Sequence, residues 1–180
     1  MKAIKYTRYT NRNTGEYHDK ESLVDMQFDD DNGYLFWRNK SNVKTFIESR
    51  LPDNLTWSEK GRVNELKNYM IQDSQLLVYR SNNCIKPLTA KEFCRILEMS
   101  DRQAKTFIKK IKALNIIIEV KTGGLVYFAF NPIYGLKAKR ITLTMYLWFQ
   151  EELQKVLPKW VNDKFLDQAI ELKPDIQIIK

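Results

Sequence analysis

The sequence predicts an α+β protein that is mainly α-helical and carries a small β-hairpin, and three observations lead to this class. At three places a hydroxyl residue is followed three positions later by Glu or Gln, a capping box that marks a helix start: Thr56, Thr89 and Ser100. Apolar residues then recur at spacings of three and four. Farther along, the stretches 116–120 and 125–130 flank Gly123-Gly124, a pair typical of a two-residue hairpin turn.

Residues 1–40 are expected to form an N-terminal extension that holds a β-hairpin. Lys2 to Thr10 alternates loosely in polarity, Asn11 to Gly15 is rich in turn-forming residues, and a second strand is expected to continue to Val24. The acidic segment from Met26 to Gly33 is expected to be a solvated loop.

Residues 41–140 are expected to form one domain. Its first helix is predicted over about 41–50, before Pro52, and its second runs from the capping box at Thr56 to about Met70. Two short strands are then expected, over 76–79 and 85–87, with a turn at Asn82-Asn83 between them.

In the next part of this domain, the sequence predicts two helices joined by a tight turn. Thr89 and Glu92 place the first start at about Ala90, and Ser100 repeats the signal with Gln103. The two starts are eleven residues apart, so only a short connection fits between the helices. Three apolar residues define the buried stripe of the first helix: Phe93, Ile96 and Leu97.

The second helix of this pair separates apolar from basic residues. One side is apolar: Ala104, Phe107, Ile108, Ile111 and Leu114. At about 100° per residue, basic and polar residues point the other way: Arg102, Lys105, Thr106, Lys109 and Lys110. No acid follows Asp101 on this helix, so the lysines are expected to lack the i,i+4 partners of a solvated helix. An unpaired positive face predicts a polyanionic partner.

A β-hairpin is expected after Asn115, which is suited to end the helix in a left-handed conformation. Lys121 and Thr122 stand at the expected tip, within reach of a phosphate or of the minor groove. Three aromatic residues of the returning strand are expected in the core or at its edge: Tyr127, Phe128 and Phe130.

A turn at Asn131-Pro132 and Gly135 is expected next, followed by three basic residues that contact phosphate or, as the alternative, form a solvated linker: Lys137, Lys139 and Arg140. Residues 141–180 are expected to form two C-terminal helices that end near Pro158 and Pro174. Their apolar surface, with Trp148, Phe149 and Trp160, exceeds what a small domain needs to cover itself. We therefore expect a homodimer interface there.

Charge is concentrated in one part of the chain. The 180 residues carry a formal net charge of +8. The segment 100–140 alone holds nine basic residues against two acidic ones, and so accounts for seven of these eight charges. Such asymmetry is typical of a surface that binds a nucleic acid.

Several classes of protein are not expected. No apolar run approaches the roughly 20 residues of a membrane span, and the N-terminus lacks the apolar centre of a signal peptide, so we expect a cytoplasmic protein. Cys84 and Cys94 are ten positions apart and His18 is the only histidine, a set that predicts no disulfide framework, no metal site and no cofactor. No nucleophile with a base, phosphate loop or carboxylate pair is recognisable, so we expect no enzyme.

The order of elements over 57–140 is that of a winged helix-turn-helix, flanked by the N-terminal extension and the C-terminal helices. The residues that carry a family likeness are Leu88-Thr89, Glu92, Leu114 to Ile117, Gly124, Asn131-Pro132 and Gly135. On these, the chain resembles the MarR-like winged-helix proteins of phages and mobile elements and is similar to the RepL-type plasmid replication proteins. The resemblance implies dimeric binding to a pseudo-palindromic duplex, with Ser100 to Lys110 in the major groove. The wing is shorter and the N-terminal extension longer than in that family.

We therefore expect a sequence-specific double-stranded DNA-binding protein that regulates transcription. Arg102, Gln103 and Thr106 are suited to base edges, because arginine matches guanine and glutamine matches adenine in the major groove. The alternative for Gln103 is that its side chain is used in the capping box. Phosphate contacts are expected from Lys105, Lys109 and Lys110.

Two other functions fit the same sequence. A plasmid or phage replication initiator would use the same helix to bind origin repeats and to recruit replication machinery. A protein-interaction adaptor would bind a partner through the aromatic C-terminal helices and keep a winged helix that does not read DNA. Genomic position of the binding sites separates the first from a regulator, and salt-dependent duplex binding excludes the second.

Overall fold

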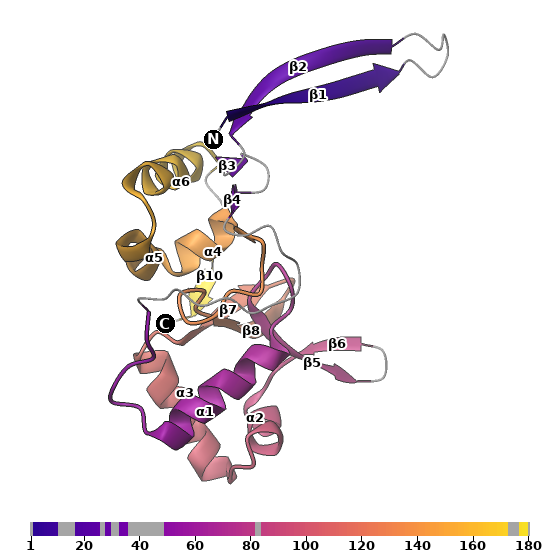
Figure 1. Cartoon of the computed structure of the whole chain (residues 1–180). Coiled ribbons are helices and arrows are strands. Elements are labelled where there is room, and N and C mark those ends of the chain that lie inside the picture. The colour runs from indigo at the N-terminus through magenta and orange to yellow at the C-terminus, as the bar shows by residue number, and fades with distance from the viewer. Residues whose placement is uncertain are drawn as a thin grey trace.

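The computed structural model describes residues 2–10, 17–25, 28–29, 33–35, 49–81, 84–172 and 177–179, which form a mixed α+β structure (Figure 1). The α+β class is confirmed. Strands supply nearly as many of the described residues as helices do, so helices do not dominate these ranges. In these ranges no helix combines the length and the apolar character that crossing a membrane requires.

An antiparallel sheet lies at the centre of the fold, in the strand order β10-β7-β8-β5-β6. Its strands are β5 (Leu76–Ser81), β6 (Cys84–Pro87), β7 (Ile117–Thr122), β8 (Leu125–Phe130) and β10 (Gln177–Ile179). β7 and β8 are the expected hairpin, and its turn residues Gly123 and Gly124 have φ values of 56° and 77°, which glycine adopts without strain. The expected strands at 76–79 and 85–87 are confirmed as β5 and β6, while the turn at Asn82-Asn83 lies outside the described residues.

Three helices pack on one face of this sheet: α1 (Trp57–Leu66), which continues into the short 3-10 helix η1 (Lys67–Tyr69), α2 (Ala90–Ile96) and α3 (Asp101–Ala113). All three capping boxes are present where the sequence predicts them. The helices and the sheet share a first core of fully buried apolar side chains: Val63, Leu66, Leu77, Phe93, Ile111, Ile117 and Phe130.

The opposite face of the sheet supplies a second core. Because successive side chains of a strand point to opposite faces, Ala129 and Val120 lie on this side whereas Phe130 and Ile117 lie on the first. Three C-terminal helices cover it: α4 (Leu143–Trp148), α5 (Gln150–Val156) and α6 (Lys159–Leu172). The sheet is therefore enclosed between two helical layers (Figure 1).

The sequence predicts two C-terminal helices, and the first of these is divided in the structure. Phe149 leaves the helical region, with φ −128° and ψ 37°, and separates α4 from α5. The break lets Phe149, at 1% exposure, join the same core as Tyr146 and Phe165, whose rings stack at 4.5 Å. Burial of an aromatic side chain gains roughly 1.5–3 kcal/mol, enough to outweigh the helix interruption. Because Phe149 is used inside the chain, the apolar surplus that suggested a homodimer is smaller than expected.

The N-terminal hairpin is confirmed as β1 (Lys2–Thr10) paired with β2 (Tyr17–Asp25), and it extends away from the two helical layers (Figure 1). The acidic segment after it is not simply a loop, as expected, because it contains β3 (Phe28–Asp29) and part of β4 (Gly33–Leu35). β4 pairs with β9 (Arg140–Ile141), and Phe28 packs edge-on against Phe165 at 5.0 Å. The helix expected over 41–50 and the turn from Asn11 to Gly15 lie outside the described residues, except that 49 and 50 are not helical.

Candidate nucleic-acid interface

α2 and α3 are joined by the four residues from Leu97 to Ser100. Glu98 in this connection has a φ of 50°, and the Met99 N–H donates to the Cys94 carbonyl at 2.9 Å, so the chain turns sharply out of α2. At the start of α3 the Ser100 N–H donates to Gln103 Oε1 at 3.0 Å. Local hydrogen bonds therefore fix where α3 begins and how it leaves the turn.

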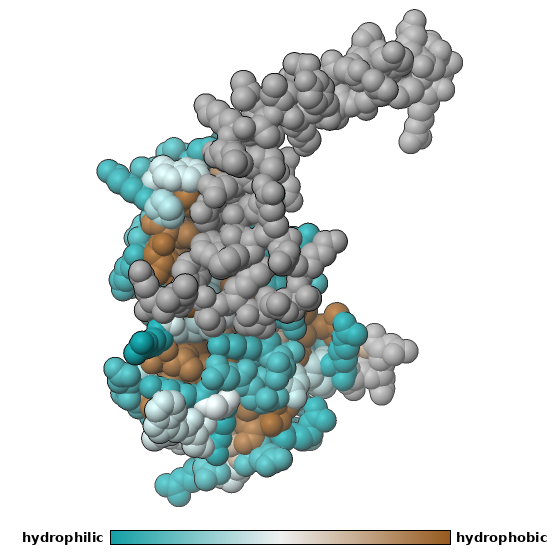
Figure 2. All heavy atoms as spheres, in the orientation of Figure 1, coloured by the Kyte–Doolittle hydropathy of each residue, from teal (hydrophilic) through white to brown (hydrophobic). Residues whose placement is uncertain are grey.

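α3 has one buried side and one solvent-facing side, as the sequence predicts. Its inner residues are almost fully covered: Ala104, Phe107, Ile108 and Ile111. Its outer residues are exposed: Arg102, Lys105, Thr106 and Lys109. Over the part of the molecule where α1 to α3 lie, the surface visible in Figure 2 is mainly hydrophilic, with hydrophobic residues in small separate areas. This part of the surface is suited to a polar partner.

The expectation that the lysines of α3 lack acidic partners is wrong for three of them. Nζ of Lys105 lies 2.7 Å from Asp101, Nζ of Lys110 2.7 Å from Glu59 of α1, and Nζ of Lys112 3.0 Å from Glu119 of β7. Asp101 also raises the pKa of the Lys105 ammonium. Two of these partners, Glu59 and Glu119, come from other elements, so the sequence of the helix alone does not reveal them. Lys110 is half-buried and held by Glu59, so it is not a ready phosphate contact.

Arg102 and Lys109 keep their charge available. Among the described residues, neither side chain has a hydrogen bond or an ion pair. A shallow groove runs along each side of the ridge that they form. One, of about 280 Å³, is lined by Glu59, Arg62, Met99, Arg102, Gln103, Thr106, Phe107 and Lys110. The other, of about 300 Å³, is lined by Ala90, Lys105, Ile108, Lys109, Lys112, Glu119 and Phe128. α3 thus stands out between two grooves with cationic side chains on both.

The remaining polar residues of α3 are partly committed to the helix itself. Gln103 Oε1 accepts from Ser100, which is the alternative that the sequence left open, and its amide nitrogen stays available to donate. The Thr106 hydroxyl donates to the Arg102 carbonyl at 3.0 Å and can still accept a hydrogen bond. The Ser100 hydroxyl accepts from the Gln103 N–H at 3.4 Å.

At the tip of the β7–β8 hairpin, Lys121 and Thr122 are exposed, together with Leu125 and Val126. The structure does not bring the later basic residues to α3. Arg140 lies on β9, and its Nη1 donates to the Gly33 carbonyl at 3.0 Å. Lys137 and Lys139 are half-buried in the preceding segment.

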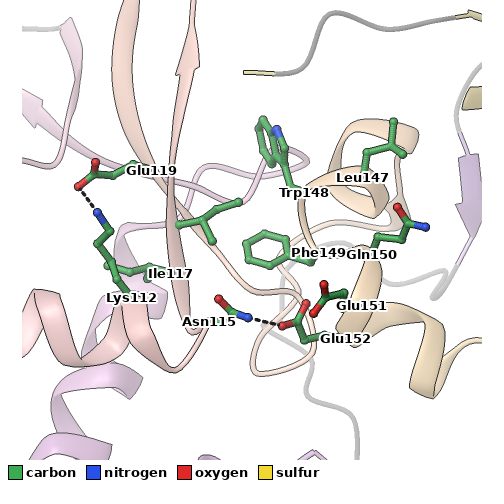
Figure 3. Close-up of a pocket in the computed structure, with 11 residues that line it drawn as sticks. Lys112, Asn115, Ile117, Glu119, Leu147, Trp148, Phe149, Gln150, Glu151 and Glu152 are labelled. Atoms are coloured by element: carbon green, nitrogen blue, oxygen red, sulfur yellow. Dashed lines mark hydrogen bonds and ion pairs between the residues drawn. The ribbon is translucent and has the colours of Figure 1, made fainter. Parts of the chain in front are cut away.

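Beyond the end of α3, a pocket of about 400 Å³ lies between β7 and the C-terminal helices (Figure 3). The charged residues in its lining are three carboxylates, Glu119, Glu151 and Glu152, and one ammonium, Lys112. The Asn115 amide donates to Glu152 at 2.8 Å and, as predicted, Asn115 has a left-handed φ of 50°. A phosphate backbone would be repelled here, so the candidate interface is confined to the side of α3 that carries Arg102 and Lys109 and to the hairpin tip.

Arg62 of α1, which sequence reasoning missed, borders this surface, because it lines the same groove as Arg102. Trp57, in the first turn of the same helix, is 88% exposed with the Lys60 ammonium 5.4 Å from its ring centre. The capping box at Thr56 predicted the helix, but nothing local in the sequence places its first turn beside α3. Comparisons of the chain with protein-family models, with curated proteins and with solved structures found no match.

Proposed function

We propose that residues 57–130 form a winged helix-turn-helix and that the chain is a sequence-specific double-stranded DNA-binding protein. Helix α1, strand β5, the α2–α3 pair and the β7–β8 hairpin follow one another in the order of that fold, apart from the added β6. β5 pairs with β8 and β8 with β7, which makes the hairpin continuous with the sheet under α3. The four-residue connection between α2 and α3 fits the short turn of a helix-turn-helix.

The observation that carries the proposal is the exposed ridge of α3. A helix about 10–12 Å across fits the major groove, which is about 12 Å wide. Arg102 and Lys109 point outward from it without a partner among the described side chains, whereas the inner stripe is buried in the first core. Such a helix can enter a groove without unpacking the protein.

The residues on this ridge divide into two roles. Arg102, with the Gln103 amide and the Thr106 hydroxyl beside it, offers donors suited to base edges. Lys105 and Lys109 are suited to phosphates, as are Lys121 and Thr122 at the hairpin tip. Lys105 must give up its ion pair with Asp101 before it can bind a phosphate, so we expect it to contribute less to duplex affinity than Lys109 does.

We propose regulation of transcription as the task, with occupancy of the duplex blocking or recruiting polymerase. A replication initiator would use the same ridge, and only the location of its binding sites differs. The adaptor function is less well supported, because Phe149 and Phe165 are almost fully buried in the second core and cannot bind a partner protein. The same burial weakens the case for a homodimer, although Ile170 and Leu172 of α6 remain 72% and 62% exposed.

Selection of duplexes from a random pool, followed by mapping of the enriched motif onto the genome, tests this function. If the recovered motif lies in promoters, the result supports a transcriptional regulator. If it lies in an origin of replication, the protein is instead a replication initiator. Failure to enrich any motif at low salt contradicts sequence-specific binding.

A further inference from the structure

A second cationic site lies away from α3, in a pocket of about 610 Å³ beside the β5–β6 hairpin. Its lining comes from η1 and the segment that follows it, from the β5–β6 hairpin, and from Arg95 of α2 and Lys137. None of the lining residues belongs to α3 or to the β7–β8 hairpin. The pocket is therefore separate from the surface proposed to bind DNA.

Three cations from three different elements meet in this pocket: Arg80 of β5, Arg95 of α2 and Lys137 of the segment before β9. None of the described lining residues is acidic, and these three side chains have no ion pair with another described residue. Glu92, one turn before Arg95 on α2, lies outside the lining; its carboxylate accepts from the Thr89 N–H at 3.2 Å and also interacts electrostatically with Arg95, so it offsets part of the Arg95 charge. The lining itself holds no carboxylate, so its three like charges raise the local positive potential and attract an anion.

The position of Lys137 is fixed by a buried amide. Gln75 is fully buried; its Oε1 accepts from the Lys137 N–H at 2.9 Å, and its Nε2 donates to the Gly135 carbonyl at 2.5 Å. On the other side, Arg80 is held in the paired part of the hairpin, opposite Ile85. These contacts hold the backbone that carries Arg80 and Lys137, so binding has to order the charged side chains but not the chain that bears them.

The rest of the lining suits a flat organic group. Tyr69 and Tyr79 are half-buried and offer aromatic surface, while Met70 and Val78 supply an apolar floor at 3% and 8% exposure. The amides of Asn68 and Gln72 can donate and accept hydrogen bonds. A cavity of this size falls in the range that holds small ligands, about 300–1,000 Å³.

We infer that this pocket binds a small phosphorylated ligand of the nucleotide class. Arg80, Arg95 and Lys137 take the phosphate groups, because guanidinium groups bind phosphate oxygens in a bidentate manner and an ammonium adds a compact charge. Tyr69 or Tyr79 takes the base by stacking. A free nucleotide, rather than the backbone of the bound duplex, is the ligand, because the site is a concavity formed by elements other than α3 and the wing.

Calorimetric titration of the full chain with ATP, tripolyphosphate and adenosine tests the inference. We expect ATP to bind, tripolyphosphate to bind more weakly and adenosine not to bind. Equal binding of adenosine and ATP, or no binding of either phosphorylated probe at low salt, would overturn it. This comparison uses the unaltered protein and does not depend on the folding of a variant.

Variants then locate the site. Arg80→Gln and Arg95→Gln each remove one exposed charge and are expected to weaken ATP binding at least tenfold, whereas Lys155→Gln on α5 serves as a control and leaves it unchanged. Lys109→Glu is expected to weaken duplex binding without changing ATP binding, which keeps this inference distinguishable from the DNA-binding proposal. Two results would contradict a separate nucleotide pocket. One is an equal loss of ATP affinity in all four variants. The other is that duplex DNA displaces ATP, and still does so in Lys109→Glu.

Discussion

Nζ of Lys110 lies 2.7 Å from Oε2 of Glu59 and 2.9 Å from Oε1, which joins the last turn of α3 to the first turn of α1. The same carboxylate accepts the Thr56 N–H at 2.8 Å and so caps α1. One side chain therefore fixes both the start of α1 and the position of the helix that we propose to enter DNA.

Stability should depend on the ionisation of Glu59. The hydrogen bond from Lys110 lowers the pKa of this carboxyl below its ordinary value of 4.5. The folded protein then binds fewer protons here than the unfolded chain, so the stabilisation is complete above about pH 4.5 and is lost as the pH falls below it. We expect Glu59→Gln to lower the free energy of unfolding by about 1 kcal/mol at pH 7 and to flatten its decline below pH 4.5. Urea unfolding across this pH range measures both effects.

Glu65→Gln provides the matched control on the same helix, because Glu65 is exposed and has no ion pair among the described residues. In Glu65→Gln the free energy of unfolding should decline below pH 4.5 as it does in the unaltered protein. If it also declines in the same way in Glu59→Gln, the contact between Glu59 and Lys110 does not contribute to stability.

The two neighbouring lysines of α3 should differ in their effect on DNA. Lys110 is neutralised by Glu59, whereas Lys109 is exposed and has no ion pair among the described residues. We expect Lys109→Ala to weaken binding to all duplexes and to reduce the salt slope by about 1, and Lys110→Ala to have a clearly smaller effect. Fluorescence anisotropy with a labelled duplex compares them. A greater loss for Lys110→Ala would place the phosphate contacts on the groove beside Glu59 instead.

Arg102 should supply sequence preference. Replacing it with Ala is expected to cost about 1–3 kcal/mol on the preferred duplex and to relax selection at one base position. Competition between the preferred site and its single-base variants measures this. If Arg102→Ala weakens all duplexes by the same factor, Arg102 is a phosphate contact.

Gly33 should be required for the contact between the N-terminal segment and β9. It has a φ of 75°, and an added Cβ would lie 2.3 Å from the Ile141 carbonyl oxygen. That oxygen belongs to backbone, which cannot move aside cheaply, so we expect Gly33→Ala to destabilise the protein by more than 2 kcal/mol. Thermal unfolding monitored by circular dichroism measures the change.

Gly61→Ala is the control for this substitution. Gly61 lies inside α1, and no atom of the described residues stands within 4 Å of an added Cβ. Alanine there should raise stability by about 0.5–1 kcal/mol through its higher helix propensity. A loss of stability at both glycines would indicate that the close approach to Ile141 is not the cause.

Sequence patterns predicted the local features of the fold and missed those that join distant segments. Capping boxes, the left-handed Asn115 and the glycine turn depend on residues within a few positions of one another, so they are visible in the sequence. The burial of Phe28 against Phe165 and the pairing of β4 with β9 depend on residues more than a hundred positions apart. The break at Phe149 likewise follows from tertiary burial, which overrides helical periodicity.

The candidate site divides in the same way. The exposed side of α3 follows from helical periodicity, and Arg102, Lys105, Thr106 and Lys109 are exposed as predicted. The pairing of Lys110 with Glu59 joins residues 51 positions apart, and no local pattern reports it. The same holds for Arg62 beside Arg102, which only the packing of α1 against α3 reveals.

The central claim, that the ridge of α3 binds duplex DNA, is tested most directly by the salt dependence of duplex affinity for the unaltered chain and for Lys109→Glu, with Lys155→Glu as the control. We expect affinity to fall steeply with salt, and we expect Lys109→Glu to bind all duplexes more weakly with a slope reduced by about 1, while the control is unchanged. Affinity and slope that are the same in Lys109→Glu as in the unaltered chain would contradict it.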